Sequence, residues 1–203
     1  LLDQEDKKQL FMNIYNYITE TTYAECASEA LKPFTKLVHI ANEDEKELYL
    51  KYAYSLLNSI VDGSFKAFNG KDIFNDQIDL YLMTNIAYLI CECVRYKSTT
   101  VDELCEFMIH IIKSSLDSAY LYAFIGAYSD VIKFNTGSEE SIQAILDLLP
   151  QLIENAKDPD TKLNITYLLS LLVQKDPQSI QNVQDFIPTL QQWYEKGKES
   201  PNG

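Results

Sequence analysis

One stripe of apolar residues occurs three times in this chain, at a constant step of 41 residues. Its spacing is that of a single buried helix face. The middle copy consists of Ile142, Ile145, Leu146, Leu149, Leu152 and Ile153. Apolar or aromatic residues recur at the same six spacings from Val101 and from Val183. Three ungapped copies of one template predict stacked helical units.

A second helix is expected after the first and second copies. Its apolar set at Phe124, Ala127, Tyr128 and Val131 shifts by the same step onto Ile165, Leu168, Leu169 and Leu172. Each unit is therefore predicted to be a pair, with a first-type helix followed by a second-type helix. The first-type spacing also occurs from Ala27 to Val38, and a second-type set begins at Leu50. The template thus extends toward the N-terminus.

The complete pattern predicts a helix order for the whole chain. We expect a second-type helix over residues 4–20 and a first-type helix over about 179–196, with helix pairs between them at about 23–62, 64–96, 100–134 and 138–175. The glycine-bearing stretch "VDGSFKAFNGKDIFND" leaves room for only a short or irregular first helix in the second pair.

The second-type helix after that stretch fits two registers. An apolar set at Met83, Ile86, Ala87 and Ile90 extends the 41-residue step. The alternative aligns "NIAYLICECV" from Asn85 with "NITYLLSLLV" from Asn164, 79 residues later. The two registers differ by nearly one helical turn and bury similar faces, so both remain open.

Composition favours an all-α fold without a membrane span. Hydrophobic residues make up 46% of the chain, while Gly and Pro number 6 each, which disfavours disorder and a turn-rich β fold. No apolar run reaches the length of a membrane span. The four cysteines lie in apolar runs without a spaced pair-of-pairs pattern, as reduced core cysteines do, which indicates an intracellular protein.

The charge and the side chains exclude several functions. A net charge of −13 disfavours nucleic acid as a partner and is compatible with basic protein segments. His39 and His110 have no flanking metal ligands, and no phosphate-binding loop occurs. We therefore predict no catalytic residue, no metal, no cofactor and no enzyme. The predicted protein-binding residues are Asp79, Asn85, Glu92, Asp130, Asn164 and Trp193.

The helix pairs carry further features that resemble a known repeat. Prolines occur within the predicted first-type helices at Pro33, Pro150 and Pro188, and an acidic turn lies at Asp158-Pro159-Asp160. These features resemble HEAT repeats over most of the chain, although the Arg or Lys expected in the second helix is mostly absent. The resemblance implies an α-α superhelix, a HEAT/armadillo-like solenoid of about four to five antiparallel helix pairs. With a half repeat at each end, residues 1–203 are expected to be a single segment excised from a longer protein.

Within this class, "DPDTKLNITYLLSLLVQKDPQSI" followed by "FIPTLQQW" resembles the C-terminal repeats of karyopherin-β (importin-type) nuclear transport receptors. That resemblance implies basic cargo, a small GTPase acting through the full-length chain, and a cytoplasmic protein that shuttles to the nucleus. Two alternatives remain. One is a HEAT scaffold of a phosphatase, a coat adaptor or another multi-protein complex, and the other is the helical accessory region of a large enzyme.

Overall fold

The chain is built from helices. The computed structural model describes residues 3–71, 79–96, 101–134, 138–175 and 180–198, and these contain no strand. The prediction of an all-α fold is confirmed. The longer helices are α1 (Gln4–Glu20), α2 (Ala24–Ile40), α3 (Glu43–Val61), α4 (Leu80–Arg95), α5 (Val101–Ser114), α6 (Leu121–Phe134), α7 (Glu139–Asn155), α8 (Pro159–Lys175) and α10 (Ile187–Lys198). The short ones are η1 (Lys66–Phe68), α9 (Ile180–Val183) and η3 (Gln184–Phe186).

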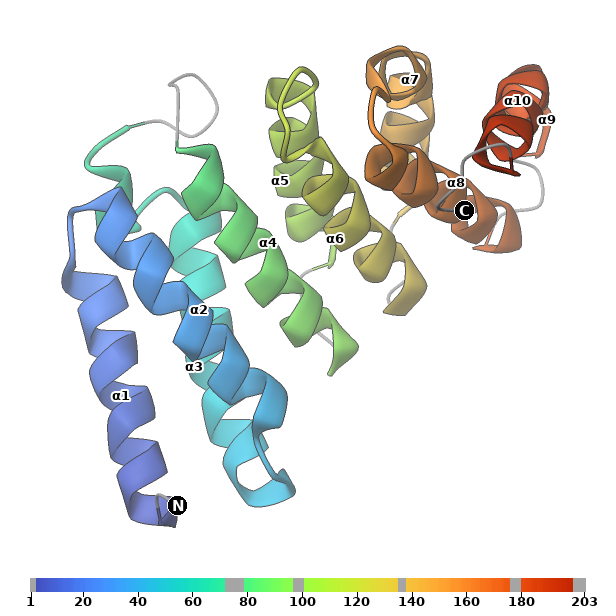
Figure 1. Ribbon diagram of the computed structural model, residues 1–203. Coiled ribbons are helices and arrows are strands. Elements are labelled where there is room, and N and C mark those ends of the chain that lie inside the picture. Colours follow the sequence, from blue (N-terminus) through green and yellow to red (C-terminus); the bar gives the residue numbers. More distant parts are fainter. Residues whose placement is uncertain (1–2, 72–78, 97–100, 135–137, 176–179, 199–203) are drawn as a thin grey trace.

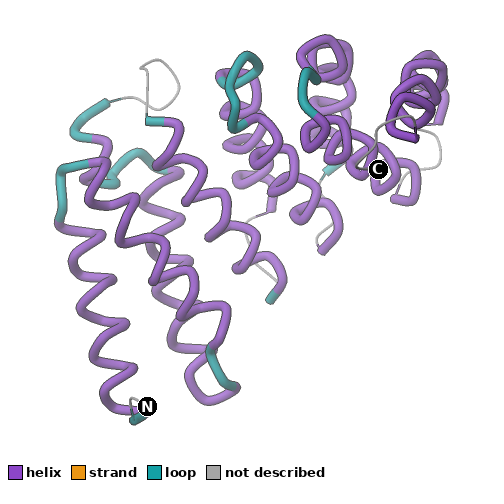
Figure 2. Tube along the Cα trace, in the orientation of Figure 1, coloured by secondary structure: helices purple, strands orange, loops and turns teal. Residues whose placement is uncertain are grey.

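Most of the helices are arranged in two rows. α2, α4, α6 and α8 pack one against the next and form what we call the front row (Figure 1). α3, α5 and α7 form the back row, and α1 packs on α2 and α3. The same two rows can be followed in the tube of Figure 2. Consecutive helices therefore alternate between the rows from α2 to α8.

Burial explains why front-row helices are apolar on more than one face. α4 and α6 each have two neighbours in their own row and further contacts with the back row. Accordingly, α4 buries Leu82 and Ile86 together with Leu89, Ile90 and Cys93, all at 0% exposure. An apolar surface of this size stabilises a packed helix and needs no membrane.

Both helices of the predicted pair at 23–62 are present, as α2 and α3, but the layers predicted for them are wrong. The shared apolar spacing predicts that the first helix of this pair lies in the same row as the helix at 101–112. Instead, α2 lies in the same row as α4, α6 and α8, and α3 lies in the row of α5 and α7. An apolar stripe identifies the buried face of a helix but not the layer that the helix enters, and this ambiguity produced the error. Pro33 in α2 and Pro150 in α7 consequently belong to different rows.

The irregular stretch after α3 follows from the same correction. Since α3 already supplies a back-row neighbour for α4, the described residues 62–71 need no full helix. They contain the short η1, with Gly63 at φ 76° and Gly70 at φ 72°, positive values that glycine adopts easily. The predicted irregular connection is thus confirmed for the residues that the structure describes there.

The helix predicted over about 179–196 is present from Ile180 onward, but it is not one regular α-helix. The chain forms α9, then η3, then α10, which begins at Ile187. Pro188 has no backbone N–H to donate to the Gln184 carbonyl, so the α-helical hydrogen-bond ladder is interrupted there. Proline is well tolerated in the first turn of a helix, so a new helix begins here instead of α9 continuing.

Candidate functional site

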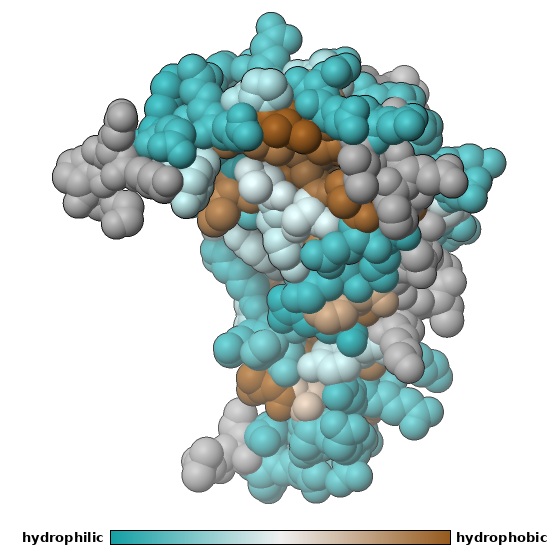
Figure 3. All heavy atoms as spheres, turned by 90° about the vertical axis from the view of Figure 1, so that its right-hand side faces the viewer, coloured by the Kyte–Doolittle hydropathy of each residue, from teal (hydrophilic) through white to brown (hydrophobic). Residues whose placement is uncertain are grey.

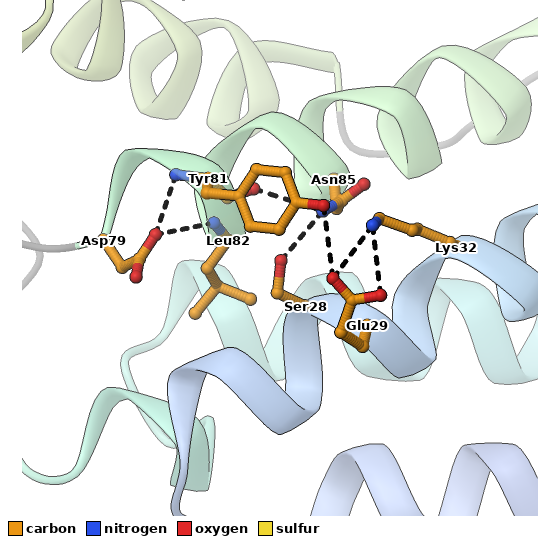
Figure 4. Close-up of polar contacts among 7 residues, drawn as sticks. All are labelled: Ser28, Glu29, Lys32, Asp79, Tyr81, Leu82 and Asn85. Atoms are coloured by element: carbon orange, nitrogen blue, oxygen red, sulfur yellow. Dashed lines mark hydrogen bonds and ion pairs between the residues drawn. The ribbon is translucent and has the colours of Figure 1, made fainter.

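The contact between α2 and α4 contains two of the predicted residues (Figure 4). Asn85 donates from Nδ2 to Ser28 Oγ at 2.8 Å and to the Tyr81 carbonyl at 3.2 Å. Asn85 is 6% exposed and Ser28 is 1% exposed. Asp79 caps α4, because its carboxylate accepts from the backbone N–H groups of Tyr81 and Leu82. Both residues position α4.

A charged cluster lies beside this contact. Lys32 donates to both carboxylate oxygens of Glu29, at 2.9 and 3.1 Å, and Tyr81 donates its hydroxyl to Glu29 at 3.2 Å. The Lys32 ammonium also lies 4.8 Å from the centroid of the Tyr81 ring. Hydrogen bonding to Tyr81 and to Glu29 raises the pKa of Lys32, and the bond from Lys32 lowers the pKa of Glu29. Lys32 and Glu29 are exposed, so water screens their ion pair and the two side chains can separate easily.

A second polar contact crosses three front-row helices. His39 Nδ1 on α2 lies 2.9 Å from Glu92 Oε2 on α4, and Arg95 donates to Glu92 Oε1 at 2.9 Å. Arg95 also reaches Asp130 on α6 at 3.3 Å. Partial burial alone would lower the pKa of Arg95, but the two carboxylates outweigh it and raise the pKa. Glu92 and Asp130 are thus brought together, but as partners of Arg95.

A groove of about 470 Å³ separates the exposed parts of α2 and α4. One wall comes from α2 and the other from α4. Tyr88 supplies an aromatic surface that is 48% exposed. The lining residues are Lys32, Thr35, Lys36, His39, Asn85, Tyr88 and Glu92. The groove therefore combines an apolar surface with side chains that hold charge or form hydrogen bonds, as sites for peptide segments do.

The two remaining predicted residues belong to other contacts. Asn164 on α8 donates from Nδ2 to the Tyr122 carbonyl on α6 at 2.7 Å. Trp193 on α10 is partly buried, and the Lys162 ammonium lies 5.9 Å from its ring centroid. Figure 3 looks onto the end of the molecule where α10 lies and shows apolar side chains gathered in its upper part. Leu163 and Ile187 are 66% and 43% exposed.

Sequence reasoning missed the α2 side of the groove. Lys32, Lys36 and His39 were not among the predicted residues, because α2 had been assigned to the other layer. Their spacing of i, i+4 and i+7 places them on one helix face, and that signal was readable in the sequence. Tyr88 lies three residues after Asn85 on the same helix, so it could also have been predicted to line a binding site.

No described group of His, Cys, Asp and Glu side chains could hold a metal ion. Burial raises the pKa of the Cys91 and Cys93 thiols, so both stay protonated and unreactive at neutral pH. Within the described ranges, no helix is both long and apolar enough to cross a bilayer.

Comparison with known proteins adds no relative. Models of protein families, curated proteins and solved structures were searched, and none matches this chain.

Proposed function

We propose that this chain is a protein-binding scaffold, part of a HEAT-like α-solenoid that performs no reaction itself. The groove between α2 and α4 carries the proposal, because it opens between two successive helices of one row and presents both apolar and charged side chains. Support also comes from the packing, in which each helix of the front row buries a face of the next. Stacked helix pairs of this kind create extended binding surfaces.

The narrower prediction is an importin-type receptor for basic cargo, with a small GTPase engaged through the full-length chain. The net charge of −13 supports a basic partner in general terms. The front-row carboxylates support it less, since Glu92 and Asp130 are already paired with Arg95. A better surface for such cargo is formed by exposed acids at the starts of back-row helices, namely Asp44 on α3 and Glu139 and Glu140 on α7. A phosphatase or coat-adaptor scaffold and an enzyme's accessory region would use the same rows.

A pull-down with variants on each row tests the scaffold. The immobilised chain is compared with a front-row variant, Tyr88→Ser with Tyr167→Ser, and with a back-row variant, Lys51→Ser with Asn58→Ser. All four positions are exposed. The proposal expects partners retained by the native chain and the back-row variant to be lost by the front-row variant. Partners held equally by all three proteins would place binding elsewhere and refute the front-row assignment.

A further inference from the structure

We propose that the α2–α4 groove binds an extended acidic segment of a partner protein, with carboxylates at alternate residues. This inference rests on the proposed scaffold function and gives its partner a chemistry. It is carried by a line of basic side chains along one wall of the groove.

The line consists of Lys32, Lys36 and His39, which all contribute to the groove lining. Residues four apart lie on the same face of a helix. With a rise of about 1.5 Å per residue, the Cα atoms of Lys32 and Lys36 are separated by about 6 Å along α2. Both lysines are exposed, so their ammonium groups can reach a ligand in the groove.

The charge in the groove is unbalanced toward positive. Each oxygen of Glu92 already accepts from a basic group, Arg95 or His39. Lys32 is paired with Glu29. Lys36, in contrast, takes part in none of the ion pairs found among the described residues. An uncompensated ammonium in this groove attracts a carboxylate and repels a basic segment.

The spacing of the two lysines matches an extended peptide. In a strand, side chains on one face are two residues apart, which is about 6.6 Å. Two alternate carboxylates can therefore meet Lys32 and Lys36 at once. Glu29 competes for Lys32, but an ion pair between two exposed side chains is weak in water, so a carboxylate of the ligand can replace Glu29. Tyr88 on the opposite wall offers an apolar surface for the rest of the segment.

The test uses labelled peptides and fluorescence anisotropy on the full chain, at low and at physiological salt. One peptide carries Glu at three alternate positions in a Gly/Ser background. Its companions carry Gln or Lys at the same positions, or the same three Glu residues spaced every fourth position. The alternate-Glu peptide is expected to bind at least about fivefold more tightly than each companion, and less tightly at higher salt.

Three variants locate the binding. Lys36→Glu is expected to weaken the alternate-Glu peptide by about tenfold, through loss of one attraction and gain of one repulsion. Glu29→Gln removes the internal competitor and is expected to strengthen binding by about twofold to threefold. Lys51→Glu makes the same charge change on back-row α3 and should leave the affinity unchanged. Circular dichroism of each variant confirms the native helix content.

Several results would overturn the inference. One is that the alternate-Glu peptide binds no more tightly than its Gln companion. Another is that the Lys peptide or the every-fourth Glu peptide binds as tightly as the alternate-Glu peptide or more tightly. A third is that Lys36→Glu and Lys51→Glu reduce the affinity for the alternate-Glu peptide equally. Partners that depend on Tyr88 and Tyr167 while no acidic peptide binds would refute the acidic chemistry and leave the scaffold standing. Partners that bind the front-row variant as well as the native chain would refute the front-row assignment on which this inference rests.

Discussion

Asn85 and Asn164 make equivalent contacts in two parts of the front row. Each is the sixth residue of its helix, and each donates a side-chain hydrogen bond to the preceding front-row helix. Asn85 reaches Ser28 on α2, whereas Asn164 reaches the Tyr122 carbonyl on α6. This equivalence favours the 79-residue register, which aligns the two asparagines, over the register that extends the 41-residue step. It also shows that both side chains join helices within the row.

Replacing Asn85 tests how much this contact stabilises the fold. Asn85→Ala removes the partner of the hydroxyl of Ser28, a residue that is 1% exposed, and leaving a buried polar group unsatisfied costs about 1–3 kcal/mol. We expect the free energy of unfolding, measured with urea, to fall by that amount. Ser28→Ala combined with Asn85→Ala should cost less than the sum of the single changes, since both partners are then gone.

Asn155→Ala is the matched control, because the side chain of this partly buried asparagine donates to the Gln151 carbonyl of its own helix and not to a neighbouring helix. Its effect should stay within about 0.5 kcal/mol. Equal losses from the Asn85 and Asn155 variants would contradict the role given to the α2–α4 contact.

Gly126 is expected to be coupled to Asn164. A Cβ added at Gly126 would lie 3.2 Å from Asn164 Nδ2, which is a tight contact. Alanine inside a helix is favoured over glycine by about 1 kcal/mol, and we expect the contact to offset most of that gain in the native chain. In an Asn164→Ala background, Gly126→Ala should stabilise by the full amount. A double-mutant cycle measured by urea unfolding checks the coupling, and identical effects in both backgrounds would disprove it.

The sequence predicted the positions of the helices better than it predicted which helices pack against each other. Stripes such as the one from Ile142 to Ile153 predicted where most helices lie, since burial of one face constrains the spacing directly. The row to which α2 belongs could not be predicted from its apolar stripe. Leu31 and Phe34 are fully buried, and an apolar stripe of this kind is compatible with either row. Layer membership depends on contacts with α4, which lies some fifty residues away in the sequence.

The candidate site was only partly readable for a related reason. Asn85 and Glu92 were predicted as binding residues, and both line the groove. Whether a polar side chain is available to a partner depends on what neighbouring helices bring to it. Arg95 pairs with Glu92 and Asp130, and that pairing makes both carboxylates less available to a basic partner. The place of Lys36 in the groove depends on the packing of α2 against α4, which the sequence did not predict.

The thiols should differ sharply in reactivity. Cys93 and Cys105 are fully buried and Cys91 nearly so, and burial raises the pKa of all three, that of Cys105 to about 11. Cys26 is only partly buried. We expect a thiol reagent such as DTNB to modify one cysteine rapidly in the native chain and all four in urea. Cys26→Ser should abolish the rapid phase, and a rapid phase that persists in this variant would contradict the assignment.

Tyr54 should make the fold sensitive to alkaline pH. Its hydroxyl donates to the Cys93 carbonyl at 3.0 Å, and burial raises its pKa to about 12. In the unfolded chain a tyrosine ionises near pH 10. The folded state therefore keeps the proton to a higher pH, so stability is fully present below about pH 10 and is lost as the pH rises toward 12. Tyr128, whose pKa burial also raises, adds to the loss.

Tyr54→Phe removes the ionisable group and should make the free energy of unfolding less dependent on pH between about 10 and 12. At neutral pH the same variant should lose about 1 kcal/mol with the hydrogen bond to Cys93. Urea unfolding across this pH range measures both effects. Tyr23→Phe is the control, because Tyr23 is 72% exposed and its replacement should leave the pH dependence as it was. If Tyr54→Phe and the native chain lost stability in parallel above pH 10, the buried hydroxyl would not be the source of the alkaline sensitivity.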